Sequence, residues 1–257
     1  MNKIFNLNRF GRLFYKHTTE HYKSYLMSII VLLGIMILGG SFLIYMADIP
    51  IDEEFQAVLF MSMLLLSGTI FTSTVFADLG DKKKAVAWLT LPATHFEKYM
   101  VAWIYTVLVF LLAYTISFYG VVLVAIHLKH FPGHYPRVLN VFQKTVVEIC
   151  LVYAFLHGIS FWGAICFKRL HFIKTAFIFF ISFGVLVFIN KIMLGALLGR
   201  TVEAAPPFGS PRLYDNSSFT DINISKQQQS GFMVSLMVAL AIIFWVAAFY
   251  RLKEKQV

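Results

Sequence analysis

The chain has 257 residues, of which 59% are hydrophobic and only 14% are charged, a composition too apolar for an ordinary soluble domain. Its formal net charge of +9 would suggest nucleic-acid binding in a soluble protein. Here, however, the Lys and Arg residues fall in short segments beside apolar runs, where such residues set membrane orientation and meet anionic lipid. The composition therefore predicts an integral membrane protein, and we set nucleic acid aside as a partner.

Six apolar stretches are long enough to cross a bilayer, whose hydrocarbon core requires about 20 residues per helix. They are continuously apolar rather than alternating, which excludes a β-barrel and predicts an all-α fold with residues 1–257 in one transmembrane domain. The first stretch is long enough to remain as a span rather than to act as a cleaved signal peptide. The predicted spans are 24–46, 55–77, 99–127, 145–167, 174–198 and 232–250.

The distribution of basic residues predicts the orientation of these spans. Fifteen of the 22 Lys and Arg residues lie in the N-terminal segment, in residues 78–98, between the fourth and fifth spans, and in the C-terminal tail. Six lie in the connections on the other side, where the first loop is also acidic. Because Lys and Arg concentrate in cytoplasmic loops, we expect both termini in the cytoplasm.

Residues 1–23 have the pattern of a helix that lies on the cytoplasmic membrane surface. At 100° per residue, apolar side chains gather on one side and basic side chains nearly opposite, as an interfacial helix requires. The alternative is a simple positively charged anchor for the first span. The predicted membrane contacts are Phe10 and Phe14 on the apolar side and Arg9, Arg12 and Lys16 on the basic side.

The cytoplasmic connection 78–98 is longer than two neighbouring spans need, and its sequence predicts a helix of its own. The run "KKKAVAWL" can form a short helix that Pro92 must interrupt. Thr94 and Glu97 then match a capping box, so the third span should begin near His95. Two interpretations remain: a docking element for a cytoplasmic partner, or a positively charged loop whose aromatic residue lies in the membrane interface.

On the outer side, the connection 199–231 contains prolines and polar residues that exclude a seventh span. Glu148 and Lys191 stand inside predicted spans, both near the outer ends of their helices. They could form an ion pair there or extend to the lipid headgroups. A proton relay is not favoured, because a relay needs ionisable groups spaced across the bilayer.

Signatures of catalysis and of metal binding are missing. The sequence contains no "GxxxxGK[ST]" phosphate loop, no "HExxH" and no "GxSxG". His127, His130 and His134 are spaced like metal ligands, but an intervening Pro-Gly pair breaks the helix that would aim them together. His157 lacks a second histidine at matching depth, so a haem pair is not expected. We therefore expect no intrinsic enzyme activity, and neither a metal nor a cofactor bound by this chain.

The order of these parts resembles the membrane subunit of type-2 ATP-binding-cassette (ABC-2) transporters, particularly small six-span bacterial permeases whose ATPase is a separate chain. In that family the N-terminal helix is called the elbow, and the segment between spans two and three is the coupling helix that docks on the ATPase. The stretch Leu89–Tyr99, "LTLPATHFEKY", is similar to the "LTLPAS..EKY" stretch common in such permeases, with Thr94 in place of serine.

The resemblance implies a permease of the bacterial cytoplasmic (inner) membrane, of the exporter type, that forms the translocation pathway. Its expected partners are an ABC ATPase, which would carry the ATP and Mg²⁺, a second permease copy or paralogue, and membrane lipid. The alternative is a non-transporting membrane sensor or assembly protein that binds a cytoplasmic partner through 78–98. In either case the expected docking residues are Lys82, Lys83, Lys84, Val86, Trp88, Leu89 and Leu91.

Overall fold

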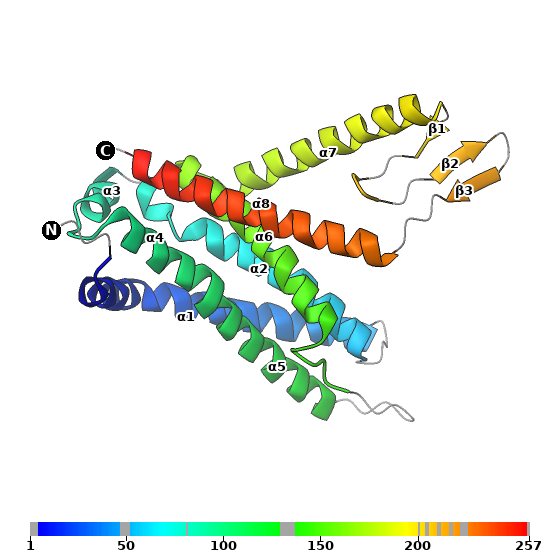
Figure 1. The fold of residues 1–257 in the computed structure, drawn as a ribbon. Coiled ribbons are helices and arrows are strands. Elements are labelled where there is room, and N and C mark those ends of the chain that lie inside the picture. Colours follow the sequence, from blue (N-terminus) through cyan, green and yellow to red (C-terminus); the bar gives the residue numbers. More distant parts are fainter. Residues whose placement is uncertain are drawn as a thin grey trace.

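The computed structural model describes residues 5–46, 52–80, 82–128, 137–199, 201–203, 206–209, 212–215, 218–221 and 226–255. Within these residues, six helices are long and apolar enough to cross a membrane, and each overlaps one predicted span. They form an elongated bundle in which both chain termini lie at the same end (Figure 1), which we call the termini end. The protein is therefore a helical membrane protein in its main architecture.

The long helices run back and forth between the termini end and the opposite end (Figure 1). The third span has three consecutive parts, with the π-helix η2 between α4 and α5. The bounds are α1 Leu7–Met46, α2 Glu53–Thr74, α4 His95–Ile104, η2 Tyr105–Val109, α5 Phe110–Leu128, α6 Lys144–Cys166, α7 His171–Leu198 and α8 Lys226–Glu254.

Helix α1 differs from the expectation of two separate helices. It is one continuous α-helix of 40 residues that includes both the predicted interfacial segment and the first span. In Figure 1 its first turns are seen nearly end-on while the rest lies across the view, so the helix bends. Residues 12–33 contain neither proline nor glycine, and the backbone hydrogen bonds can therefore continue from the basic segment into the apolar one.

The second connection contains two short helices at the termini end. The 3₁₀-helix η1, Ala77–Gly80, follows α2, and the α-helix α3, Lys82–Leu89, comes next. A turn with Pro92 then leads to α4, which begins at His95. The short helix and the start of the third span thus occupy the residues that the sequence analysis gave to them.

Helix α6 is the central helix of the bundle and packs against α2, α7 and α8. Because lipid tails are as apolar as the side chains, such packing depends on small residues that let helices approach closely. Gly163 is one of these, since a Cβ at this position would overlap the side chain of Thr175 on α7. In contrast, most of α1 and α7 leaves its apolar side chains exposed on the bundle surface.

The all-α expectation does not extend to the segment between α7 and α8. Three short strands form an antiparallel sheet in the order β1-β2-β3 at the end opposite the termini (Figure 1). Their bounds are β1 Thr201–Val202, β2 Arg212–Asp215 and β3 Ser218–Asp221. These segments are too short for the alternating pattern by which a strand is recognised in a sequence.

Candidate functional site at the termini end

Two helices begin beside each other at the termini end, and each has a side-chain cap. The Asn6 Oδ1 atom accepts hydrogen bonds from the backbone amides of Asn8, at 3.0 Å, and Arg9, at 3.4 Å, which caps α1. Thr94 caps α4, where its hydroxyl accepts from the Glu97 amide at 3.3 Å and its own amide donates to Glu97 Oε2 at 3.0 Å. Both halves of the capping box are thus present.

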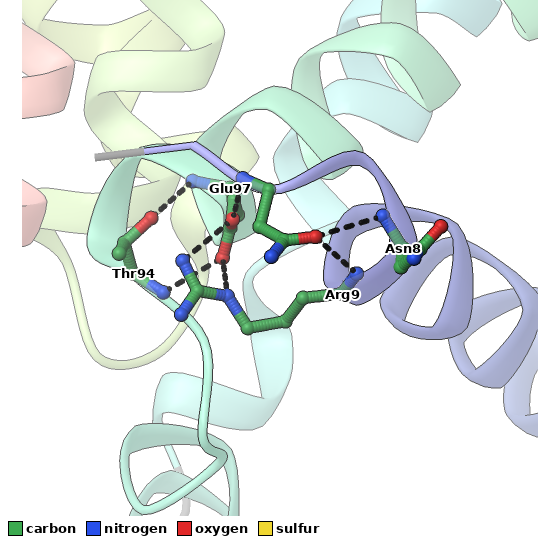
Figure 2. A network of polar contacts seen from close by, with 5 residues as sticks. Asn8, Arg9, Thr94 and Glu97 are labelled. Atoms are coloured by element: carbon green, nitrogen blue, oxygen red, sulfur yellow. Dashed lines mark hydrogen bonds and ion pairs between the residues drawn. The ribbon is translucent and has the colours of Figure 1, made fainter. Parts of the chain in front are cut away.

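The Glu97 carboxylate joins these two helix starts (Figure 2). Arg9 donates from Nε to Oε2 at 2.6 Å and from Nη2 to Oε1 at 2.8 Å, and the Asn6 amide donates to Oε1 at 2.9 Å. Glu97 is fully buried, whereas the Arg9 side chain is 35% exposed. The positive ends of two helix dipoles point toward this anion, which strengthens the contact. We call the group of Asn6, Arg9, Thr94 and Glu97 the Glu97 junction.

Aromatic contacts continue this attachment between α1 and the third span. The Phe14 ring stacks on Tyr105 with the ring centroids 4.8 Å apart, and the Thr18 hydroxyl is hydrogen-bonded to the Tyr105 hydroxyl. The Phe10 ring lies 5.3 Å from that of Phe5. Thus Arg9, Phe10 and Phe14, which were predicted to contact the membrane, all have contacts within the protein.

Helix α3 is attached to the bundle through one face. Ala85 is buried on this face, and the Trp88 ring meets Phe76 edge to face with centroids 6.1 Å apart. The Lys98 ammonium lies over the same Trp88 ring, 5.2 Å from its centroid, in a cation–π contact. Trp88 was predicted to dock a partner, but in the structure its half-buried ring is part of the internal packing.

The buried residues around α3 come from three of the spans, from the segment that follows α2, and from α3 itself. We call them the termini-end cluster: Phe76, Leu79, Ala85, Tyr99, Ala102, Phe161, Ala164, Ile165, Ala248 and Leu252. Gly80 lets the chain pass close to the turn after α6, because a Cβ there would overlap the carbonyl oxygen of Lys168. Lys255 donates to the Ile165 carbonyl at 2.8 Å, and burial lowers the pKa of this lysine. Helix α3 therefore packs against residues of several spans.

The opposite face of α3 is exposed. Lys83, Val86, Ala87 and Thr90 are three or four residues apart and thus share one side of the helix. Lys84 is exposed beside them, and Val86 is 42% exposed. Of the other predicted docking residues, Leu91 is half-buried. The side chains of Lys82 and Leu89 lie outside the described part of the chain.

The remaining predicted site residues lie apart from the Glu97 junction or on its margin. Arg12 is exposed on α1, and Lys16 lies 3.5 Å from Glu20 one turn further along the same helix. Near the opposite end, Glu148 is 3.7 Å from Lys144, also one turn away on its own helix. Lys191 is exposed on α7. Its pairing with Glu148 stays a prediction.

A buried polar network inside the bundle was not expected from the sequence. His157 on α6 is fully buried, and Trp245 donates from Nε1 to its Nδ1 atom at 3.0 Å. The histidine proton is therefore on Nε2, which lies 2.8 Å from the Thr106 hydroxyl. Tyr153 donates to the Thr106 carbonyl at 2.6 Å. Both ring nitrogens of His157 are thus satisfied, as in a structural histidine that holds α6, α8 and the third span together.

In the described part of the chain, no group of three or more His, Cys, Asp or Glu side chains lies close enough to hold a metal ion. His130 and His134 lie outside that part. At the termini end, α3 and the start of α1 pack against the transmembrane helices through the termini-end cluster and the Glu97 junction. No protein-family model, curated protein or solved structure matches the chain.

Proposed function

We propose that the chain is the permease subunit of an ABC transporter of the type-2 exporter class, driven by a separate ATPase. The observation that carries the proposal is the position of α3 between the second and third spans. One face of this helix rests on the termini-end cluster, and the other presents Lys83 and Val86 to the exterior of the bundle. A partner can therefore bind the exposed face of α3 without breaking the contacts that hold α3 on the bundle.

In this function the exposed face of α3 docks on the ATPase. Val86 supplies an apolar contact, and Lys83 faces acidic residues at the margin of the groove, as in other interfaces with an apolar centre and a charged rim. The Trp88 ring connects α3 to Phe76 and Lys98 and supports this surface from inside. The docking surface is thus centred on Lys83 and Val86.

A movement of the ATPase would be passed to the transmembrane helices through two sets of contacts. The termini-end cluster connects α3 to α4, α6 and α8 and to the segment that follows α2. The Glu97 junction connects the start of α4 to α1. ATP binding and hydrolysis on the partner, with its Mg²⁺, would move α3, and the attached spans would follow as rigid bodies. The permease then needs no catalytic residue of its own.

The exposed apolar surfaces of α1 and α7 suit the remaining proposed partners. Large side chains on α7, among them Phe177, Phe180 and Phe188, are more than half exposed in the single chain. Lipid or a second permease copy or paralogue would cover them in the membrane. Two such chains would enclose the translocation pathway between them.

The docking surface can be tested with a pair of surface variants. We expect Lys83→Glu combined with Val86→Asp to release the ATPase when the permease is purified from membranes that contain both proteins, because both substitutions place an anion on the docking face. The matched control is Lys168→Glu with Leu170→Asp, a similarly exposed pair in the turn after α6 at the same end. This control should keep the ATPase bound.

The measurement is the amount of ATPase and of ATP hydrolysis recovered per permease, after size-exclusion chromatography shows that each variant is folded. Retention of the ATPase by the α3 variant would contradict the docking surface. If the native protein yields no P-loop ATPase but another cytoplasmic protein that the same variant releases, the chain is instead the sensor or assembly protein of the alternative interpretation.

A further inference from the structure

Two neighbouring cavities open between the start of α1 and the α3–α4 connection. Their volumes are about 270 Å³ and about 410 Å³. Leu13, Lys16 and Leu91 line both cavities, so the two adjoin. We call them together the basic cleft. Their sizes lie near or within the range of about 300–1,000 Å³ that small-molecule sites occupy.

Among the charged side chains that line the basic cleft, cations outnumber anions. Among its described lining residues, Glu20 is the one acidic side chain, and it lies 3.5 Å from Lys16. Lys98 is only 3% exposed, so part of the positive charge lies below the surface. The cationic lining residues are Arg9, Arg12, Lys16, Lys84 and Lys98, and His17 and His21 lie beside them. Even with Arg9 paired to Glu97 and Lys16 close to Glu20, the site favours an anion.

The deeper wall of the first cavity is apolar. Val75 and Phe76 at the end of α2 and Val101 and Ala102 on α4 form this wall. The cleft therefore combines cationic with apolar side chains, and Lys98 lies one turn from Val101 and Ala102 on α4. This arrangement matches an amphiphile whose anionic headgroup meets the lysines while its first methylene groups contact the spans.

We propose that the basic cleft binds the anionic headgroup of a membrane phospholipid. The cleft lies between helices at the termini end, which carries most of the basic residues and which the charge distribution places on the cytoplasmic side. Basic pockets between transmembrane helices on that side suit anionic headgroups. The bound lipid bridges α1 and α3, whereas the Glu97 junction joins α1 to α4. It thereby fixes the orientation of α3.

The test uses the full-length purified permease without any ATPase, so that its result does not depend on the proposed transport function. Native mass spectrometry measures the binding of short-chain phosphatidylglycerol, with short-chain phosphatidylcholine as the neutral probe. We expect phosphatidylglycerol to bind more tightly than phosphatidylcholine. Lys16→Gln with Lys84→Gln should weaken the phosphatidylglycerol affinity by about fivefold for each lysine removed.

The matched control is Lys168→Gln with Lys253→Gln, which removes two exposed lysines at the same end but outside the cleft. This control should retain the affinity of the unmodified protein. Equal losses of phosphatidylglycerol affinity in the two double variants would mean that binding depends only on the total positive charge at this end. That result would overturn the proposal. If the Lys16/Lys84 variant does not fold, Lys84→Gln alone, at an exposed position, is compared with Lys168→Gln.

A further arm distinguishes a lipid headgroup from a free anion. Inorganic phosphate is added at constant ionic strength, and thermal unfolding of the protein is followed with and without phosphatidylglycerol. The proposal predicts that phosphatidylglycerol raises the unfolding temperature and that phosphate does not. Equal protection by phosphate would show that the cleft takes a soluble anion, and would overturn the assignment to lipid.

Discussion

Glu97 connects the start of α4 to the start of α1 at the termini end. Its carboxylate completes the cap of α4 and also accepts hydrogen bonds from Arg9 and from the Asn6 amide. A buried carboxylate is tolerated only when such donors compensate for the loss of water. The "Thr94-x-x-Glu97" spacing predicts the local cap, but nothing near it in the sequence indicates a guanidinium from 88 residues away.

A double-mutant cycle can measure the coupling between Arg9 and Glu97. Glu97→Gln should lower the free energy of unfolding by about 1.5–3 kcal/mol, because the amide can keep the cap but loses the charge-assisted bonds. Arg9→Gln should also lower the free energy of unfolding, since it leaves the Glu97 carboxylate with fewer donors. The double variant should lose less than the sum of the two single variants in detergent unfolding titrations.

Arg12→Gln provides the control for this cycle. Arg12 lies one turn from Arg9 and is exposed, so its replacement should change the free energy of unfolding by less than about 0.5 kcal/mol. If the effects of Arg9→Gln and Glu97→Gln simply add, the two side chains do not interact in the protein and the Glu97 junction is wrong.

Among the elements, the π-helix η2 provides a contact between the third span and α6. The Phe110 amide donates to the Tyr105 carbonyl, five residues earlier, which widens the helix at this point. Within the widened turn, the Thr106 carbonyl accepts the Tyr153 hydroxyl of α6, and the Thr106 hydroxyl lies within hydrogen-bond distance of His157. The irregular turn therefore serves as an attachment point between spans.

Tyr153→Phe tests this attachment without changing the shape of the side chain. Loss of the hydroxyl should lower the free energy of unfolding by about 1 kcal/mol, because the buried Thr106 carbonyl would lose a hydrogen-bond partner. Tyr15→Phe is the matched control, since the Tyr15 side chain is 71% exposed. An equal effect of the two substitutions in thermal unfolding would contradict a role for the Tyr153 hydroxyl in holding η2.

For the whole molecule, the structure sets which connections share an end, and the charge distribution predicts which end is cytoplasmic. Lys168, at the termini end, and Phe142, at the opposite end, are both exposed and flank α6 on its two sides. They are therefore suitable positions for single-cysteine labelling in a protein whose Cys150 and Cys166 have been replaced.

In intact cells, we expect Phe142→Cys to react with a membrane-impermeant maleimide. Lys168→Cys should react only after the membrane has been opened, because the termini end would lie in the cytoplasm. Replacement of both native cysteines without a new one supplies the background. Labelling of Lys168→Cys in intact cells would reverse the orientation and remove the basis for a cytoplasmic ATPase at α3.

The sequence by itself determined the class of the protein, its six spans, the short helix α3 and the cap of α4. These features depend on apolar length, Pro92 and the Thr94–Glu97 spacing, all of which act between residues close together in the chain. Only the tertiary structure decided that Arg9 binds Glu97, that Trp88 faces inward, and that His157 is held by Thr106 and Trp245. An amphipathic pattern indicates that an apolar side chain is shielded from water. In a membrane, either lipid or a neighbouring helix can shield it, and the sequence does not distinguish the two. Only the packing of the helices shows which of the two covers a given side chain.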